Sequence, residues 1–392
     1  MQLSDFDYEL PEELIAQTPM EPRDHSRLLN INLSNSSITE TKFYDIIDEL
    51  GENDVLVLNK TRVINARLHG YITSSLTKGS PEVGGDGLTK KCEIFLHKQI
   101  SDNTWDCLVF PGKKLKPGKV INFYLNVASS PLTRVQSTPL KTGLVAGRGE
   151  LRGGLQEELG GVPIMSATIK DISDSGRIVV FDKGGIEFLE IVEKLGSIPL
   201  PPYIKEKLEN NERYQTVFNE VEGSVAAPTA GLHFTEELIE KLENKGVRFE
   251  KVLLHVGLGT FKGVETDNIL EHKMHHEYIE LEQEVAERLN KYKKQGKRII
   301  SVGTTSIRVL ESFAQDNGEL TYGSKDTNIF IYPGYKWKIV DGIITNFHLP
   351  KSTLIMLVSS FAGGELIKKA YQYAVENKFR FFSFGDAMFI KK

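Results

Sequence analysis

The sequence predicts an α/β fold of two domains, in which an α/β domain is interrupted by an inserted all-β barrel domain. The 392 residues are enough for two domains. Short alternating apolar segments, separated by Gly, Pro, Asn and Ser, fill residues 65–181, as in an all-β barrel or sandwich. Strands alternate with helices in residues 1–64 and 182–392, as in an α/β domain.

The first part of the α/β domain, residues 1–64, carries two clear elements. The segment ELPEELIAQ, residues 9–17, predicts a short helix with Pro11 near its first turn. The segment DVLVLN, residues 54–59, predicts a compact strand because it is a short apolar run bounded by the polar segments GEN and KTR.

The inserted domain is predicted to hold strands at residues 65–73, 91–100, 104–112, 118–129 and 176–185. Two Gly-rich stretches without periodicity, residues 74–91 and 141–161, predict loops. Cys92 and Cys107 alternate with apolar residues in these strands, and their spacing excludes a CxxC zinc site. We therefore expect both thiols to be buried and unreactive.

In the second part of the α/β domain, residues 182–392, helices are predicted to alternate with strands. Gly196 follows one helix as a candidate C-cap, and Thr235 precedes another as a candidate N-cap. The predicted helices cover residues 186–196, 235–246, 283–296, 306–314, 352–363 and 366–378, with strands at 249–257 and 298–303. Because ligands often bind between two domains, we expect a site where the barrel joins its host.

The composition is that of an ordinary soluble protein, with 40% apolar and 26% charged residues. No apolar run approaches the roughly 20 residues of a membrane helix. The first 19 residues are acidic and lack the pattern of a signal peptide, which favours a cytoplasmic protein. The net charge of −5 gives no indication of nucleic-acid binding, but a local basic patch could still bind phosphates.

Six of the nine histidines lie between residues 233 and 348, and imidazoles suit proton transfer near neutral pH. His233 lies in the small-residue segment APTAGLHFT, where Thr229 and Gly231 would let a backbone approach a ligand ahead of a helix. A packed His233 in a plain helix-entry loop explains the segment equally well.

The segment LLHVGLGTF places His255 on an apolar strand that runs into Gly257 and Gly259. Ligands of α/β sheets gather beyond the carboxyl ends of strands, which favours a site here. A core histidine is an equal alternative, and the glycines do not form a GxGxxG dinucleotide motif.

The segment HKMHHE, residues 272–277, holds three histidines that would share one face of a helix and suggests zinc. The following segment EYIELEQE alternates like a strand instead, and the HExxH and HxxEH motifs are absent. We therefore favour a polar loop that supplies a catalytic His275 or Glu277.

Two further polar segments precede predicted helices. SVGTTSIR places Thr304 and Thr305 between a strand and a helix, where N–H groups and hydroxyls suit a carboxylate or phosphate, although a simple helix cap is the alternative. TNFHLPKSTL places Asn346 and His348 in a similar loop.

Three basic side chains lie at the domain junction: Lys60, Arg62 and Arg67. They could neutralise phosphates, and the alternative is that they are ordinary surface charges.

Together these segments resemble the S-adenosylmethionine:tRNA ribosyltransferase-isomerase family of queuosine biosynthesis. The resemblance runs from end to end, outside the Gly-rich inserts near 74–90 and 141–165, which are longer than the family pattern. The stretches that carry it include DFDYELPEELIAQTPMEPRDHSRLL, VLNKTRVINARL, FPGKKLKPG, GSVAAPTAGLHFT, HVGLGTF, HKMHHE, VGTTSIRVLES, TNFHLPKSTLIMLVSSFAG and FSFGDAMFI.

The resemblance implies a barrel-like α/β domain with an inserted β-barrel, and an unusual reaction. S-adenosylmethionine, a co-substrate with no further cofactor or metal, donates its ribosyl group to the aminomethyl group of a 7-deazaguanine (preQ1) at the tRNA wobble position. Adenine and methionine leave, and epoxyqueuosine forms. The partners implied are this tRNA and S-adenosylmethionine, with no membrane, and we expect a cytoplasmic monomer.

The roles that follow are hypotheses. We expect His233, His255 and His275 to converge on one site between the domains, with His348 or Glu277 next in line as acid or base. Thr304 and Thr305 would meet the methionine carboxylate, and the three basic junction residues would face tRNA. The remaining substrate-binding candidates are Thr229, Gly231, Gly257, Gly259 and Asn346.

Three other function classes remain open from the residues alone. A non-catalytic RNA-binding module would release no adenine. A metal-dependent hydrolase using HKMHHE would respond to chelators. A methyltransferase would release S-adenosylhomocysteine, although the glycine-rich turn common in that class is absent.

Overall fold

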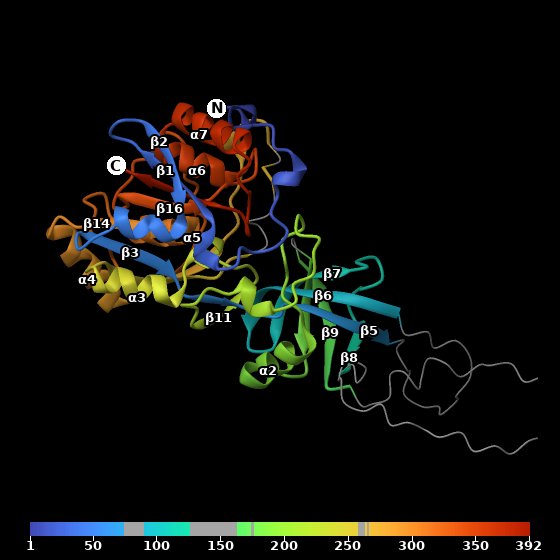
Figure 1. Cartoon of the computed structure of the whole chain (residues 1–392). Helices are drawn as coiled ribbons and strands as arrows, with labels where there is room; N and C mark the ends of the chain where they lie inside the picture. The colour runs from blue at the N-terminus through green and yellow to red at the C-terminus, as the bar shows by residue number, and fades with distance from the viewer. Residues whose placement is uncertain (74–89, 126–162, 174–175, 258–262, 265) are drawn as a thin grey trace, which may run out of the picture. The chain divides into compact units, whose positions relative to one another are not determined.

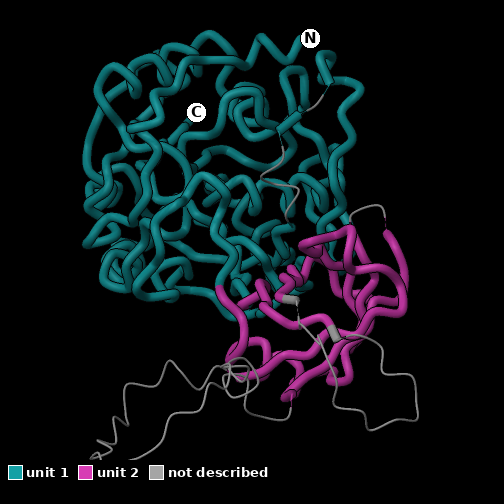
Figure 2. Tube along the Cα trace, turned by 90° about the vertical axis from the view of Figure 1, so that its right-hand side faces the viewer, with its two compact units in different colours: residues 1–64, 198–392 teal, residues 65–197 magenta. Residues whose placement is uncertain are grey.

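The computed structural model describes residues 1–73, 90–125, 163–173, 176–257, 263–264 and 266–392. The two predicted Gly-rich loops lie outside these residues, except that Lys90 and Lys91 begin a strand. The described residues form two compact units, one of residues 1–64 and 198–392 and one of residues 65–197 (Figure 2).

The second unit extends beyond the predicted boundary at residue 181. Helix α2, Gly185–Leu195, belongs to this unit because its Phe188 packs on Phe181 and Trp105, with ring centroids 4.8 and 5.7 Å apart. The two ends of the unit also pair with each other. Arg67 and Ser197 exchange two backbone hydrogen bonds of 3.2 and 3.0 Å.

The first unit is built on a sheet of nine strands in the order β15-β13-β12-β3-β14-β16-β17-β1-β2 (Figure 1). The four strands β12, β3, β14 and β16 are parallel, and the antiparallel strands β13 and β17 flank them. The sheet has edges at β15 and β2, so these strands form no closed ring of the barrel-like kind. The bounds are β1 Arg27–Asn32, β2 Ser37–Lys42, β3 Asp54–Asn59, β12 Arg248–Leu254, β13 Glu277–Leu281, β14 Arg298–Val302, β15 Gly323–Thr327, β16 Gly342–Asn346 and β17 Ala387–Lys391.

Helices cover both faces of this sheet, which explains why β3 is apolar at every position that faces a core. Val55 and Val57 pack into a core that includes residues of α4 to α7, whereas Leu56 and Leu58 pack into a core with α1 and α3. The helices are α1 Ile46–Glu49, α3 Glu236–Asn244, α4 Gln283–Lys294, α5 Gly303–Phe313, α6 Thr353–Ala362 and α7 Gly364–Glu376. The predicted α/β class is confirmed.

The second unit contains a closed barrel in the order β10-β7-β6-β5-β8-β9, with β9 pairing β10. Gly70 lies where a side chain would not fit, because a Cβ there would be 2.6 Å from Cγ2 of Ile121. Cys92 and Cys107 are buried free thiols, as predicted. The strands are β5 Arg67–Thr73, β6 Lys90–Ser101, β7 Thr104–Phe110, β8 Val120–Phe123, β9 Met165–Ile172 and β10 Arg177–Phe181.

Shorter elements complete the first unit. The parallel pair β4 Thr61–Val63 and β11 Val221–Ser224 lies apart from the main sheet. Short 3₁₀ helices are η1 Leu3–Phe6, η2 Glu12–Leu14, η3 Arg23–His25, η4 Phe43–Asp45, η6 Asn211–Tyr214, η7 Thr229–His233 and η9 Ile269–Glu271.

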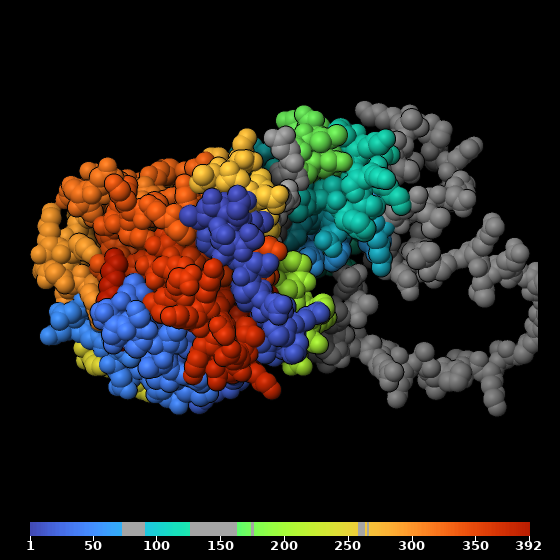
Figure 3. Space-filling model, turned by 90° about the horizontal axis from the view of Figure 1, so that it is seen from above, coloured from blue at the N-terminus to red at the C-terminus, as the bar shows by residue number. Residues whose placement is uncertain are grey.

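The predicted helix at residues 9–17 is mostly wrong. Only η2 is helical, because Leu14 and Ala16 are drawn into backbone hydrogen bonds with Phe381. The N-terminal segment therefore lies against the C-terminal part of the chain (Figure 3). The predicted strand at residues 54–59 and the helix capped by Thr235 are confirmed, since the Thr235 hydroxyl accepts from the Leu238 N–H at 3.1 Å.

Candidate functional site

Polar segments gather beyond the carboxyl ends of three parallel strands in the first unit. Thr304 and Thr305 open α5 directly after β14, and His348 follows β16, which ends at Asn346. Gly257 lies shortly after the end of β12. In α/β sheets this edge is where ligands bind, because the connections to the next helices leave a crevice there. Two cavities meet at this edge and share Thr304, Thr305 and Leu354.

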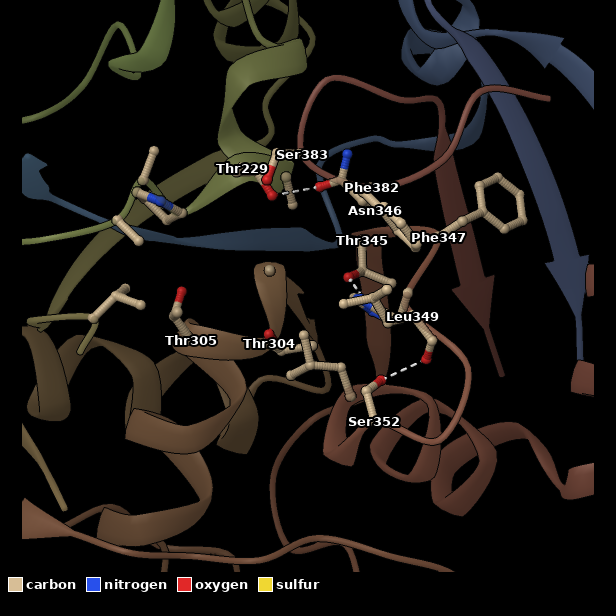
Figure 4. A pocket seen from close by; sticks show the side chains of 18 of the residues that line it. Thr229, Thr304, Thr305, Thr345, Asn346, Phe347, Leu349, Ser352, Phe382 and Ser383 are labelled. Atoms are coloured by element: carbon tan, nitrogen blue, oxygen red, sulfur yellow. Dashed lines mark hydrogen bonds between the residues drawn. The ribbon is translucent and has the colours of Figure 1, made fainter. Parts of the chain in front are cut away.

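The first cavity has a volume of about 80 Å³ and lies between η7, the start of α5 and the loop after β16. Figure 4 shows Thr229 and Asn346 on one side of it and Thr304 and Thr305 on the other. The Thr229 hydroxyl donates to Oδ1 of Asn346 at 2.9 Å. The predicted substrate-binding residues from three separate segments are therefore brought together.

His233 holds Asn346 in place from behind the first cavity. Its Nε2 is 3.1 Å from Nδ2 of Asn346, and its Nδ1 is 2.7 Å from the Ser26 hydroxyl. Because an amide nitrogen only donates, Nε2 is the acceptor, and the Nδ1–H donates to Ser26. The ring also stacks on Phe43 with centroids 4.9 Å apart. Both nitrogens are thus used within the fold.

His348 lines the first cavity, and the fold fixes its position. Its Nε2 is 3.0 Å from the Thr345 hydroxyl, its backbone N–H donates to the Tyr371 hydroxyl at 3.0 Å, and its carbonyl accepts from Tyr8. Burial lowers the pKa of His348 to about 3. Burial, with the charges of Arg380 and Arg23, lowers the pKa of His233 to about 3. Both imidazoles are neutral at physiological pH.

The second cavity is larger, with a volume of about 330 Å³. Pockets for small molecules commonly have 300–1,000 Å³, so its size suits such a ligand. It lies on the other side of Thr304 and Thr305 from the first cavity. Its walls carry both apolar and charged side chains, among them His272, Lys273, His275, Glu277, Arg308, Phe330 and Leu357.

A buried ion pair forms part of the second cavity wall. Glu277 and Arg308 are 6% and 7% exposed, and Nη1 of Arg308 donates to Oε2 of Glu277. The Gly257 N–H donates to the other carboxylate oxygen at 2.9 Å. Gly257 therefore acts here by holding Glu277. Burial lowers the pKa of Arg308 to about 10, which leaves the guanidinium charged at neutral pH.

His275 lies on the second cavity, as an exposed side chain from the loop before β13. The strand β13 begins at Glu277, which agrees with the prediction that HKMHHE is not helical. Among the residues that the structure describes, no three His, Cys, Asp or Glu side chains gather where they could hold a metal ion. None of the described helices is long and apolar enough to span a membrane.

The predicted convergence of His233, His255 and His275 on one cavity is wrong. His255 lines neither cavity, because strand alternation turns it to the opposite face from Leu254 and Val256. Its Nδ1 is 2.9 Å from the Thr61 hydroxyl and its ring stacks on Tyr278. Burial lowers its pKa to about 4.

Two of the remaining predicted residues have roles in packing or lie outside the described chain. A Cβ on Gly231 would be 2.5 Å from Cζ of Phe218, so this glycine is required by packing. Gly259 lies outside the described residues.

The basic residues predicted to face tRNA hold carboxylates in the structure. Lys60 pairs with Glu282. Arg62 donates to Glu212 at 2.6 Å and to Asn219 at 2.8 Å. Arg67, in the second unit, has its Nε 3.6 Å from a carboxylate oxygen of Glu93.

Sequence reasoning missed Arg308. The available signal was its spacing, because residues four apart share one face of a helix. Thr304 and Arg308 have this spacing, and Thr305 lies three residues before Arg308. A threonine pair at the start of a helix followed by an arginine one turn later presents hydroxyls and a guanidinium to the same space.

Comparison with known proteins gives consistent matches over the whole chain. Residues 3–390 match the protein family described as queuosine biosynthesis protein. The chain is 49% identical over 390 residues to an S-adenosylmethionine:tRNA ribosyltransferase-isomerase of Carboxydothermus hydrogenoformans, and the match covers 100% of both chains. It is also similar to the crystal structure of an S-adenosylmethionine tRNA ribosyltransferase from Thermotoga maritima, at 32% identity, 99% coverage of this chain, 100% of that chain and a TM-score of 0.49.

Proposed function

Because the chain belongs to the family of queuosine biosynthesis proteins, we propose that it is an S-adenosylmethionine:tRNA ribosyltransferase-isomerase. It transfers and isomerises the ribosyl group of S-adenosylmethionine onto preQ1 at the tRNA wobble position. Adenine and methionine leave, and the product is epoxyqueuosine. The observation that carries this proposal is the 49% identity with a relative of that name over the full length of both chains.

The donor is proposed to occupy the two adjoining cavities at the carboxyl edge of the sheet. The second cavity is large enough to take much of a nucleoside with its amino-acid chain, and the first extends it toward Asn346. Thr304 and Thr305 lie between them and are proposed to meet the methionine carboxylate. We propose that the enzyme needs no cofactor beyond this co-substrate and acts as a cytoplasmic monomer.

The chemistry requires a base near C5′ of the donor, because the sulfonium charge acidifies the proton there. His275 lies on the second cavity, and we propose it as this base. His233 and His348 are poor bases, since burial keeps each pKa near 3. Their proposed role is to hold Asn346 and the loop after β16 in a fixed position, where hydrogen-bonding groups would assist the departure of adenine.

The acceptor tRNA is proposed to meet Lys60, Arg62 and Arg67. A guanidinium or ammonium that neutralises a phosphate strengthens binding without reading sequence. Lys60 and Arg62 would exchange their present carboxylate partners, Glu282 and Glu212, for phosphates. This exchange predicts binding that weakens steeply with salt.

The proposed reaction is tested with tRNA that carries preQ1 and donor labelled in the adenine and methionine parts. We expect equal amounts of adenine and methionine, released only when the tRNA is present. Release of S-adenosylhomocysteine would show a methyltransferase, and tRNA binding without adenine release would show a binding module. Either result would contradict the proposal.

The base is tested by His275→Gln, with His276→Gln as the matched control. Both side chains are exposed and adjacent in the chain, but only His275 lines the second cavity. We expect the first variant to lose about 100-fold or more in adenine release, within the usual contribution of a general base. The control should retain turnover. Equal activity of the two variants would exclude His275.

A further inference from the structure

Unsatisfied polar atoms gather around the second cavity. Ten buried side-chain nitrogen and oxygen atoms of the described residues have no hydrogen-bond partner, and four of them belong to residues that line this cavity. They are Oγ1 of Thr266, Oγ1 of Thr305, and Nε and Nη2 of Arg308. Native proteins leave few such groups unpaired, so this concentration points to a ligand that supplies the missing partners.

The free edge of Arg308 has a defined chemical preference. Glu277 takes Nη1, so Nε and Nη2 remain, and these two nitrogens present parallel N–H bonds on one side of the guanidinium. This fork matches the two oxygens of a carboxylate. Thr305, three residues earlier on the same face of α5, adds a hydroxyl that also lacks a partner.

The charge of the wall favours a zwitterion over a phosphate. Arg308 and Glu277 form a buried pair with no net charge. Among the described residues that line the cavity, the other lysine or arginine is Lys273, which is exposed, so a dianion here would meet the negative charge of Glu277 with Arg308 alone as a buried cation to balance it. An amino-acid group carries one carboxylate and one ammonium, so its net charge of zero matches that of the pair.

We propose that Arg308 binds the α-carboxylate of the methionine part of S-adenosylmethionine through Nε and Nη2, with the Thr305 hydroxyl as a further donor. Glu277 is a positioning residue, because it fixes the guanidinium through Nη1 and is itself fixed by the Gly257 N–H. This inference rests on the proposed function, which supplies the donor. It differs from the expectation that the two threonines alone meet the carboxylate.

The inference is tested by the preference for a carboxylate, measured as the ratio of two affinities. Calorimetry gives the Kd of S-adenosylmethionine and of decarboxylated S-adenosylmethionine, which lacks only the carboxylate. For the unaltered chain we expect the complete donor to bind roughly 10- to 100-fold more tightly, the usual range for hydrogen bonds to a charged group. Equal affinities would overturn the inference and leave the proposed donor site intact.

Variants then assign the preference to Arg308. Arg308→Lys keeps a positive charge beside Glu277 but loses the fork, so the affinity ratio should fall severalfold. Arg308→Met combined with Glu277→Gln removes both charges together, which avoids an isolated buried charge, and should bring the ratio close to one. A ratio that is unchanged in a folded double variant would overturn the inference.

Arg298→Lys is the matched control. Arg298 makes a two-pronged pair with Asp54, with N–O distances of 2.7 and 2.9 Å, and it lines neither cavity. Its replacement should leave the affinity ratio as in the unaltered chain. If the unaltered chain binds neither compound and releases no adenine with tRNA, both the proposed function and this inference are wrong.

Discussion

The two cavities that meet at the start of α5 differ in whether the polar side chains beside them have hydrogen-bond partners. In the first, Thr229 bonds Asn346, Asn346 bonds His233, and His348 bonds Thr345. In the second, Arg308 and Thr305 keep buried donors without partners. The Thr229–Asn346–His233 network is therefore satisfied without a ligand, whereas Arg308 and the shared Thr305 lack acceptors that a ligand can bring.

This difference indicates two separate tasks. A network in which each member is satisfied holds its side chains in one geometry, which suits a wall that must position a leaving group. Groups left unsatisfied raise the free energy of the empty site by about 1–3 kcal/mol each, and an anionic ligand removes that cost. The satisfied network beside the first cavity is predicted to affect turnover through geometry, and the unpaired donors of Arg308 and Thr305 are predicted to affect the affinity for the donor.

The largest expected effect is on the second cavity, through Glu277→Ala. This change leaves the buried Arg308 guanidinium without its counterion, and breaking a buried pair in this way costs about 3–5 kcal/mol of unfolding free energy. Chemical denaturation monitored by circular dichroism measures the loss.

Glu250→Ala is the matched control for this variant. Glu250 is as buried as Glu277, but its partner Arg288 is 46% exposed and can turn to water. We expect a clearly smaller loss. Equal losses would mean that the burial of the Arg308 pair has no special cost.

The next effect concerns pH and the imidazoles beside the first cavity. The folded chain holds the pKa of His233 and His348 near 3, below the ordinary value of 6.5. Below pH 6.5 the unfolded chain binds protons at these rings and the folded chain does not. The free energy of unfolding is therefore highest above pH 6.5 and falls toward pH 3, by on the order of 1 kcal/mol per pH unit for each ring.

This slope is measured by urea unfolding between pH 6.5 and 5, above the range in which most carboxylates titrate. His348→Gln should reduce the slope by the amount that one imidazole contributes. An unchanged slope would show that His348 is protonated in the folded chain, which would make the first cavity wall charged.

A smaller loss in the free energy of unfolding is expected for Asn346→Leu. The change removes the donor to His233 and the acceptor of Thr229, at a cost of about 1–3 kcal/mol. Because the first cavity acts through geometry, kcat should fall with little change in the Kd of the donor. Thermal unfolding and steady-state kinetics separate the two quantities.

Asn30→Leu provides the comparison, since Asn30 is a buried asparagine of β1 whose amide bonds Thr41 away from both cavities. It should lose stability but keep kcat. A similar fall in kcat for both variants would mean that stability alone explains the effect of Asn346.

The smallest effect on stability is expected for Lys60→Gln. The pair with Glu282 lies at the surface, where such pairs contribute at most about 1 kcal/mol. The KM for tRNA should nevertheless rise if Lys60 meets a phosphate. Lys205→Gln, which breaks the exposed pair with Glu12, should change neither quantity. A KM that stays the same for Lys60→Gln would remove this residue from the proposed tRNA surface.

Much of the fold could be predicted because apolar patterns report on burial. The run at residues 54–59 becomes β3, buried along its whole length, and the helix after Thr235 begins where its cap indicates. The helix predicted at 9–17 failed because its backbone pairs with Phe381, a contact that no local pattern contains. The boundary at 181 failed for a similar reason, since Phe188 packs on Trp105, which is far away in the sequence.

The candidate site was predictable only in part. Thr304 could be placed at the site because it follows a predicted strand, and ligands gather where such strands end. Asn346 and His348 were recognised only as a polar loop before a helix, and no strand was predicted ahead of them. His255 follows the same rule, but alternation turns its side chain to the other face. Arg308 was hidden because an arginine within a helix is usually a surface residue, and its burial depends on β13 and on Glu277.

The backbone bridge between Arg67 and Ser197 gives the inserted barrel ends that already lie side by side. Bringing the two flanking parts of the chain together across these 133 residues (65 through 197) therefore costs little more conformational entropy than closing a short turn. Such a segment is easily gained, lengthened or exchanged during evolution without disturbing the sheet that receives it. Removing it and joining Ile64 to Ile198 with a few glycines should give a host that still folds.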